Sequence, residues 1–210
     1  MKAADSRLVR FDREKSGRGG RLIAGVDEAG RGCWAGPVVA AAVILTDGCC
    51  PAGLDDSKKL SPRRREELFE ELRASARSWG ACAVSAAEID RTDILRATLR
   101  AMTFAVAKLK TRPQLVLVDG LQVPVLTCPA EPLVKGDATS AAIAAASVVA
   151  KVLRDRVMRA WDRRYPAYGF AAHKGYGAAA HRAVLDRIGP CPLHRQSYRP
   201  IAELDQRRMF

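Results

Sequence analysis

The chain has 210 residues, of which 48% are hydrophobic, so it is long enough for one well-buried core and short for two ordinary domains. Lysine and arginine outnumber aspartate and glutamate by 35 to 23, and the resulting formal charge of +12 favours a polyanionic partner such as nucleic acid. The six cysteines form no C-x-x-C pair and the three histidines have no ligand spacing, which argues against a zinc site and a disulfide framework.

The N-terminal segment is basic, ends in a glycine-rich run and contains no apolar stretch over its first 22 residues. It therefore predicts a flexible basic arm over residues 1–20 and no secretory signal or membrane span. We expect a cytoplasmic protein with reduced thiols. Two short strands with apolar character follow, at residues 22–26 and 36–45.

Helical and extended patterns alternate in the middle of the chain. Ser61 before Pro62 marks a helix start, and an apolar repeat at helical spacing runs from Leu68 to Trp79. A third strand is expected at 81–85, an amphipathic helix at 95–109 and a strongly apolar strand at 115–118.

The last part of the chain is predominantly helical in pattern. An alanine-rich helix follows Asp137, with one apolar stripe from Ile143 to Val157, and its small residues would let it lie close on a sheet. A final helix is expected at 178–188 before Gly189 and Pro190. The pattern predicts one α/β domain with a mixed sheet over residues 21–201, followed by a C-terminal tail at 202–210.

Four carboxylates lie at the ends of predicted elements beside glycines: Asp27, Glu28, Asp119 and Asp137. Taken singly, each fits a turn or a helix cap. Strand side chains alternate between faces, so the two adjacent acids can serve one site only where the first strand ends, and we expect the following glycines to end it. Together the four acids suit hard divalent cations and predict two-ion phosphodiester hydrolysis. Lys135 and Arg31, both flanked by glycine, would supply positive charge for phosphates.

Six motifs, in one order, then indicate a family. They lie at residues 27–40, 56–61, 118–120, 135–155, 173–177 and 194–198. Over roughly residues 21–201 the chain resembles ribonuclease HII, the type 2 ribonuclease H family. The resemblance implies a ribonuclease H-like fold, a five-stranded mixed sheet flanked by helices.

The resemblance also implies a chemistry. Asp27, Glu28, Asp119 and Asp137 match the family's carboxylate tetrad, which would hold two Mg²⁺ or Mn²⁺ ions with Asp27 between them. The expected activity is an endonuclease that hydrolyses the RNA strand of RNA/DNA hybrids and cuts 5′ of single ribonucleotides in duplex DNA. Its products would carry a 5′-phosphate and a 3′-hydroxyl.

Substrate-binding residues follow from the same resemblance. Gly30, Arg31 and Gly32 would read the ribonucleotide 2′-hydroxyl, the group that distinguishes RNA from DNA. Tyr176 would stack at the junction with DNA. The segment Ser57, Lys58 and Lys59 would contact the nucleic-acid backbone. Cys33 and Trp34 depart from the family pattern, and Tyr198 replaces a common phenylalanine. The resemblance therefore does not settle the detailed preference for one duplex over another.

Two other classes of protein fit parts of the pattern. A non-catalytic nucleic-acid-binding module would use the same charge but would gain little from clustered carboxylates facing phosphates. A DNA resolvase or transposase-type nuclease would lack the ribose-reading turn. Residues 206–210, which read Gln-Arg-Arg-Met-Phe, resemble a peptide that docks on the bacterial sliding clamp, although a plain solvated tail also explains them.

Overall fold

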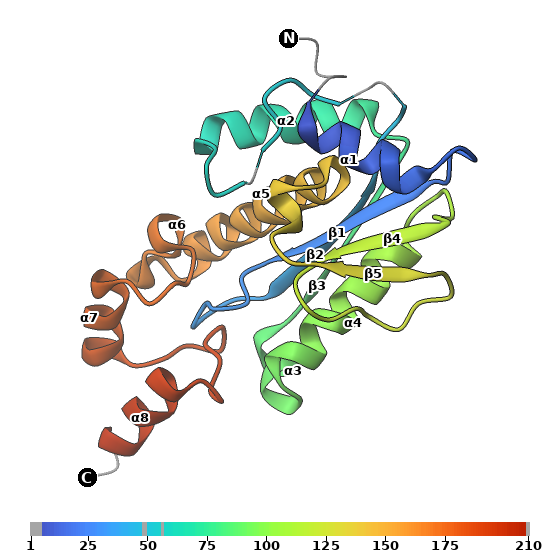
Figure 1. Ribbon diagram of the computed structural model, residues 1–210. Coiled ribbons are helices and arrows are strands. Elements are labelled where there is room, and N and C mark those ends of the chain that lie inside the picture. The colour runs from blue at the N-terminus through green and yellow to red at the C-terminus, as the bar shows by residue number, and fades with distance from the viewer. Residues whose placement is uncertain (1–5, 48–49, 56, 209–210) are drawn as a thin grey trace.

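A computed structural model describes residues 6–47, 50–55 and 57–208 of the chain. They form an α/β domain around a mixed sheet of five strands in the order β3-β2-β1-β4-β5 (Figure 1). The strands are β1 (Ile23–Ala29), β2 (Val38–Ile44), β3 (Ser78–Val84), β4 (Leu115–Asp119) and β5 (Ala130–Leu133). The predicted fold class and the five-stranded mixed sheet are confirmed.

The sheet is antiparallel on one side of β1 and parallel on the other. β1 pairs antiparallel with β2, which pairs antiparallel with β3, while β1, β4 and β5 run parallel. β5 was not predicted from periodicity because Glu131 and Pro132 interrupt its apolar pattern. Proline is tolerated there because β5 is an edge strand.

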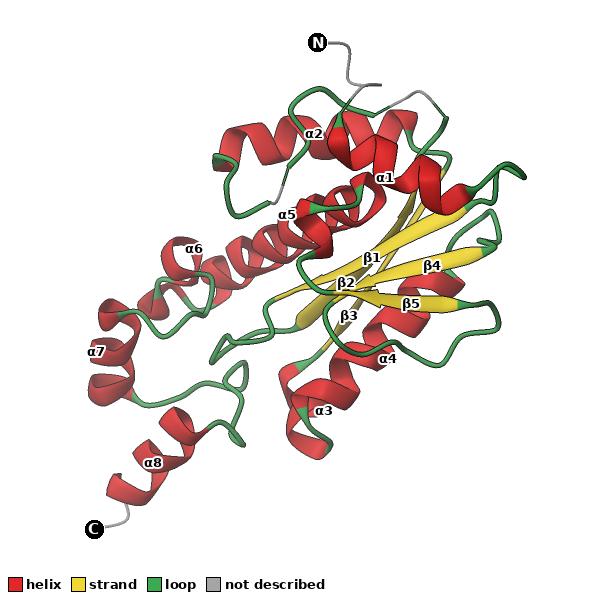
Figure 2. Cartoon of the chain, in the orientation of Figure 1, coloured by secondary structure: helices red, strands yellow, loops and turns green. Residues whose placement is uncertain are grey.

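Helices cover both faces of the sheet (Figure 2). The helices are α1 (Arg7–Ser16), α2 (Pro62–Ser75), α3 (Ala86–Arg91), α4 (Ile94–Ala107), α5 (Ala141–Arg164), α6 (Phe170–His173), α7 (Ala179–Ile188) and α8 (Arg199–Arg208), with short 3₁₀ turns η2 (Gly136–Ala138) and η3 (Pro166–Tyr168). One core cluster lies between the sheet and α2 and α5, and another lies between the sheet and α4. The helices after α5 extend away from the sheet on one side of the molecule (Figure 1).

Helix α5 packs directly against the central strand. All residues from Ala141 to Ala150 are buried, so the first part of the helix is enclosed on every side and does not present the single apolar stripe that was expected. A Cβ atom on Gly25 of β1 would lie 2.0 Å from the carbonyl carbon of Ala142. Small residues on both elements therefore set the close approach that the alanine-rich sequence predicted.

The N-terminal segment is not a flexible arm over residues 7–16. These residues form α1, capped by the Ser6 side chain, and Leu8 and Val9 pack against the core cluster beside α5. Asp12 Oδ2 accepts a hydrogen bond of 2.8 Å from the backbone N–H of Ala142 in the first turn of α5. The apolar residues among the charges make an amphipathic helix, and the glycines that suggested flexibility begin only at Gly17.

Two further boundaries differ from the sequence prediction. The chain leaves α2 at Ala76 in an extended conformation, so Trp79 belongs to β3 and not to the preceding helix. Residues 202–208, expected in a loose tail, continue α8, and Ile201 and Leu204 are buried in a third core cluster. No helix in the described part of the chain is long and apolar enough to cross a membrane.

Candidate metal centre

Three aspartates from three elements meet at one edge of the sheet. Asp27 lies in β1, Asp119 ends β4 and Asp137 lies in η2. Because β1 and β4 are parallel and pair Val26 with Val118, the next residue of each strand points to the same face. One carboxylate oxygen of each aspartate lies within 4.8 Å of the others. Oxygen ligands at this spacing suit a hard divalent cation such as Mg²⁺ or Mn²⁺.

The electrostatics of the cluster favour bound positive charge. Asp27 is only 5% exposed, and burial, followed by the charges of Glu28 and Asp119, raises its pKa well above the usual range. Like-charged carboxylates in a buried site repel one another unless a proton or a cation lies between them. A divalent cation would reverse this repulsion, so the donor set and its burial both fit a metal.

Backbone hydrogen bonds orient two of the three carboxylates. Asp27 Oδ1 accepts from the N–H of Glu28 at 2.6 Å, and Asp119 Oδ1 accepts from the N–H of Gly136 at 2.7 Å. A Cβ atom at Gly136 would lie 2.5 Å from Ile143 Cδ1, so glycine lets this N–H approach Asp119 without displacing the Ile143 side chain. The turn before α5 therefore belongs to the carboxylate site.

Ser57 lies where it was not expected. It was predicted to contact the nucleic-acid backbone, but it is only 3% exposed, and its Oγ lies 2.7 Å from Ser147 Oγ on α5. The Ser147 hydroxyl hydrogen-bonds Asp27 in turn and lowers the pKa of that carboxyl, against the larger effect of burial. Ser57 therefore acts on the site through Ser147 and is not placed to meet a substrate directly.

Glu28 is separated from the three aspartates by the pleat of β1. The strand ends directly before Gly30, as expected, but both acids lie within it, with Asp27 opposite Ala41 and Glu28 opposite Ala40. Glu28 lines a pocket of about 230 Å³ floored by α4, and Arg31 Nη1 lies 3.8 Å from its Oε1. Burial raises the pKa of Glu28, Arg31 opposes that shift, and Asp119 adds to it. Glu28 thus approaches Asp119 from the opposite face of the sheet.

Two buried arginines build the loop that follows β1. Arg195 is fully buried and donates to the carbonyls of Gly30 at 2.7 Å, Arg31 at 2.8 Å and Gly36 at 3.0 Å. Arg154, also fully buried, donates to the carbonyls of Pro37 and Ala35. Hydrogen bonds to charged donors are stronger than those between neutral groups. The loop at residues 30–36 therefore has a fixed shape that is set from α5 and from the C-terminal segment.

Glycine is required at the start of this loop. Gly30 has a φ of +93°, and a Cβ atom there would lie 1.8 Å from Arg154 Nε. Among the described residues, no heavy atom other than those of its chain neighbours lies within 4 Å of the corresponding position at Gly32, and the Arg31 side chain is 52% exposed. The conformation therefore leaves the outer edge of the Gly30–Arg31–Gly32 turn open for a ligand.

Tyr176 lies on a turn that packs against this loop. The N–H of Trp34 donates to the carbonyl of Gly175 at 2.8 Å, and a Cβ atom on Gly177 would lie 2.2 Å from the Trp34 ring. Tyr176 itself is 44% exposed, with Lys151 Nζ 5.8 Å from its ring centroid. Trp34 therefore supports the turn from beneath while the Tyr176 ring remains accessible.

A chain of histidine hydrogen bonds holds the same turn. The N–H of Cys191 donates to His194 Nδ1 at 2.9 Å, and His194 Nε2 lies 3.0 Å from His181 Nε2. With Nδ1 accepting, a neutral His194 carries its proton on Nε2 and donates to His181, whose Nδ1–H then donates to the Tyr176 carbonyl at 2.9 Å. Burial lowers the pKa of both His181 and His194 to about 4, which keeps the rings neutral.

The predicted lysines lie at the rim of the site. Lys58 is exposed, with its Nζ 3.8 Å from Asp137 Oδ2, and Lys59 pairs with Asp55 at 3.2 Å. Lys135 is exposed and has a φ of 56°, in the left-handed region. Sequence reasoning assigned no role to Ser147, Arg154 or Arg195, although all three lie in its motifs. For Ser147 the available signal was a polar residue within an otherwise apolar segment, whereas Arg154 and Arg195 lie near other polar residues and carry no such signal.

Comparisons with known proteins agree with this geometry. The family model described as ribonuclease HII matches residues 24–200. A ribonuclease HII from Albidiferax ferrireducens is 58% identical over 183 residues, which cover 87% of this chain and 88% of that protein. The crystal structure of ribonuclease H2 from Pyrococcus horikoshii matches with a TM-score of 0.76 and 26% identity, over 88% of this chain and 97% of that one. A PCNA:RNase HII complex from Archaeoglobus fulgidus matches with a TM-score of 0.73 and 29% identity, over 85% and 95%.

Proposed function

The chain belongs to the ribonuclease HII family, endonucleases that act on RNA/DNA hybrids, and we propose that it also cuts 5′ of single ribonucleotides embedded in duplex DNA, with two divalent cations. The products would carry a 5′-phosphate and a 3′-hydroxyl. The observation that carries the proposal is the approach of Asp27, Asp119 and Asp137 to within 4.8 Å, beside a loop whose outer edge is open.

The residues that would hold the cations are Asp27, Asp119 and Asp137, with Glu28 reaching Asp119 from the other face. Two Mg²⁺ or Mn²⁺ ions there would supply Lewis-acid activation of a water and stabilisation of the leaving oxygen. The protein's contribution is to aim the carboxylates: Ser147 and the N–H of Glu28 orient Asp27, and the N–H of Gly136 orients Asp119. Lys58, beside Asp137, would attract the phosphate.

The proposed reading of the ribonucleotide rests on the loop at residues 30–32. Its carbonyls point inward to Arg195, so the backbone is rigid before a substrate arrives. A rigid backbone can place polar groups against a 2′-hydroxyl without a cost of ordering on binding. Tyr176, held by the histidine chain and exposed, would stack on the neighbouring sugar or base at the DNA junction.

The proposal is tested with three duplexes of one sequence, incubated with Mg²⁺ or Mn²⁺: all DNA, DNA with one ribonucleotide, and a full RNA/DNA hybrid. We expect a single cut 5′ of the lone ribonucleotide, several cuts in the hybrid and none in all-DNA duplex. Equal cutting of the all-DNA duplex would contradict ribose recognition. Cutting of the hybrid alone would contradict the single-ribonucleotide activity.

Docking on a sliding clamp through residues 206–210 is a further part of the proposal. The similarity to the archaeal protein in its PCNA complex supports it. Gln206 to Arg208 belong to α8, and Met209 and Phe210 lie outside the described residues. The measurement is clamp binding by the whole chain and by a version that ends at Asp205, at fixed salt. Weaker clamp binding by Met209→Ala and Phe210→Ala supports groove docking. Weaker clamp binding only when Arg207 and Arg208 are replaced contradicts it.

A further inference from the structure

A second pocket, outside the carboxylate cluster, lies between α2, α5 and α6. It has a volume of about 330 Å³. Among the described residues, its charged lining comprises four cations and two carboxylates: Arg65, Lys151, Arg159, Lys174, Glu66 and Asp155. The lining therefore carries a net positive charge. Tyr176 is the one lining residue that the sequence analysis had assigned to substrate binding.

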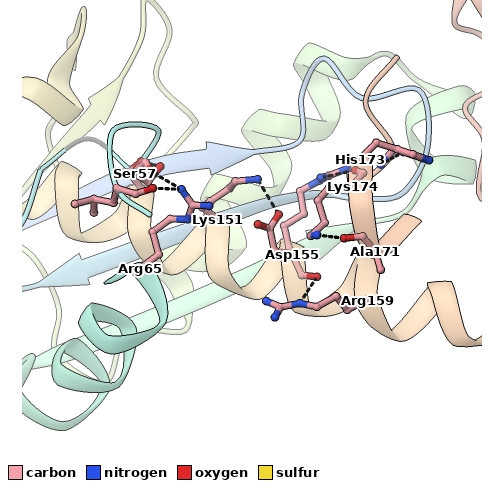
Figure 3. A network of polar contacts seen from close by, with 12 residues as sticks. Ser57, Arg65, Lys151, Asp155, Arg159, Ala171, His173 and Lys174 are labelled. Carbon is pink, nitrogen blue, oxygen red and sulfur yellow. Dashed lines mark hydrogen bonds and ion pairs between the residues drawn. The ribbon is translucent and has the colours of Figure 1, made fainter. Parts of the chain in front are cut away.

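The hydrogen bonds of these cations differ in kind (Figure 3). Lys151 Nζ donates to Asp155 Oδ1 at 2.8 Å, and Arg159 Nη2 donates to Glu66 Oε1 at 2.7 Å. Glu66 also accepts from Arg156, so both carboxylates of the lining are already paired with cations. Lys174 Nζ instead donates to the carbonyl of Ala171, and Arg65 donates to the carbonyls of Ser57 and Leu60. Carbonyl oxygens carry no formal charge, so the excess positive charge resides on Lys174 and Arg65.

Lys174 is held in this position against two unfavourable effects. Burial lowers the pKa of its ammonium group, and the charges of Arg159 and Lys151 lower it further, against an opposing effect of Asp155. Its φ of 52° lies in the left-handed region, which lysine rarely adopts. Arg154 fixes this backbone by donating to the Lys174 carbonyl at 2.9 Å. Strain of this kind concentrates at functional sites, and an anion would relieve the repulsion among the cations.

The pocket lies on a line with the carboxylate cluster. Ser147, which hydrogen-bonds Asp27, is followed by Lys151 and Asp155 at intervals of four residues on one face of α5. Eight residues of helix span about 12 Å. Tyr176 lines the pocket and lies beside the Lys151 ammonium group.

We propose that this pocket binds one backbone phosphate of the nucleic-acid duplex, away from the scissile bond, through Lys174 with Arg65 alongside. The inference rests on the proposed function, because it takes the carboxylate cluster as the point of cutting. Free inorganic phosphate has the same chemistry. Alignment with Ser147 and the exposed Tyr176 favours a phosphate that is part of a strand.

The first measurement is duplex affinity without metal, in EDTA, for the parent chain, Lys174→Gln and Lys110→Gln. Glutamine retains an N–H donor for the Ala171 carbonyl while removing the charge. Lys110 is an exposed lysine just after α4, so its variant has the same net charge but leaves the pocket intact. We expect about 10-fold weaker binding and a salt slope reduced by about one for Lys174→Gln only. Equal affinities of the two variants would overturn the proposal.

The second measurement identifies the phosphate. Each phosphate of the duplex is replaced in turn by an uncharged methylphosphonate, and affinity is compared between the parent and Lys174→Gln. At one position the neutral linkage should weaken the parent by about 10-fold and leave the variant unchanged, because both changes remove the same interaction. If every neutral linkage weakens duplex binding by the variant as much as by the parent, the pocket binds no backbone phosphate. If Lys174→Gln does not fold, Arg65→Gln is scanned in the same way, because Arg65 is the other cation named in the proposal.

Two controls separate the remaining outcomes. Saturable binding of inorganic phosphate that Lys174→Gln abolishes, with duplex affinity unchanged, would assign the pocket to a free anion and overturn the proposal. Cleavage by the parent chain at a single ribonucleotide is measured separately, with Mg²⁺. A positive methylphosphonate scan without such cleavage would uphold the pocket and contradict the proposed function. Normal cleavage with a flat scan would contradict the pocket alone.

Discussion

At the scale of single residues, the carboxylate cluster combines groups that would repel one another in isolation. Asp27 is buried beside Glu28 and Asp119. Burial and the negative charges of these two neighbours all disfavour its charged form. The structure nevertheless directs hydrogen-bond donors at the cluster, from the N–H groups of Glu28 and Gly136. Donors stabilise ionised carboxylates, so the arrangement is suited to charged ligands around a cation and less to a buried protonated pair.

Asp119→Asn should abolish cleavage while leaving duplex binding within about threefold of the parent, because the change removes a metal ligand and no positive charge. Asparagine can still accept from the N–H of Gly136, so the turn before α5 should keep its shape. The measurements are single-turnover cleavage and affinity in EDTA. Asp186→Asn, an exposed position on α7, is the matched control and should behave as the parent does. Full activity of Asp119→Asn would contradict its role.

Tyr176→Ala should weaken cutting at a single ribonucleotide by an amount equivalent to about 1 to 3 kcal/mol of stacking. Tyr176→Phe keeps the ring and should retain most activity. Because the ring is 44% exposed, neither change should alter the melting temperature by more than a few degrees. An equal loss on long hybrids, which have no DNA junction at the cut, would show that Tyr176 acts only through the shape of its turn.

At the scale of elements, segments remote in sequence assemble the face that carries the loop after β1 and the Tyr176 turn. The loop after β1, the turn after α6 and the C-terminal segment are joined by Arg195, Arg154 and the histidine chain. Helix α1 likewise contributes to the site end of α5, because Asp12 accepts from the N–H of Ala142. Burial raises the pKa of Asp12 to about 6, with hydrogen bonds opposing that shift. Packing between elements therefore holds the loops whose own sequences are glycine-rich.

The histidine chain predicts a defined dependence on pH. Both His181 and His194 have a pKa lowered to about 4, so the unfolded chain binds protons more readily than the folded one between the ordinary value of 6.5 and about 4. Their contribution to stability is therefore complete above pH 6.5 and decreases as the pH falls, by on the order of 3 kcal/mol for each group. NMR titration of the imidazole protons should show neither ring titrating above pH 5.

Protonation would place N–H groups face to face between His181 and His194, and their repulsion would disturb the turn that His181 holds through the Tyr176 carbonyl. Single-ribonucleotide cleavage should therefore decline below pH 5 in step with the two titrations. Cleavage of a long hybrid at the same pH is the control, because protonation of the metal ligands would lower both activities. His194→Gln serves as the comparison because it removes one titrating ring. A His181 or His194 that titrates near 6.5 would contradict the proposed tautomers.

At the scale of the whole molecule, positive charge is concentrated toward the C-terminal end. Residues 151–210 contain 13 lysines and arginines against 5 acids, a net charge of +8 out of the total of +12. Several of these cations are engaged internally, such as Arg154 and Arg195 in the loop and Arg156 on Glu66. The excess nevertheless creates a long-range field that attracts a polyanion.

Raising the salt concentration from 50 mM to 200 mM should weaken duplex affinity steeply, by about 10- to 1,000-fold if several phosphates are neutralised. The measurement is equilibrium binding without metal over a salt series, and the slope of log affinity against log salt estimates the number of phosphate contacts. A flat response would mean that the basic face is not the binding face. Lys110→Gln, far from the pocket, should leave the slope unchanged.

The sequence by itself determined the elements whose causes are local. Ser61 accepts from the N–H of Arg64 and starts α2, and β4 ends at Asp119 where the apolar run ends. α7 begins one residue from its predicted start and ends at Ile188, as predicted. Caps, apolar runs and glycine stops act within a few residues, so they can be read from the chain directly. The family motifs likewise marked the aspartates of the cluster.

Only the tertiary structure decided which side chains meet. Ser57 and Ser147 are 90 residues apart and share a buried hydrogen bond, and Arg195 reaches the Gly30 carbonyl across 165 residues. The pleat of β1 sends Glu28 to the opposite face from Asp27, and α1 folds because α5 offers it a partner. Such contacts depend on the packing of several elements at once, and no local pattern encodes a hydrogen-bond partner that lies on another element.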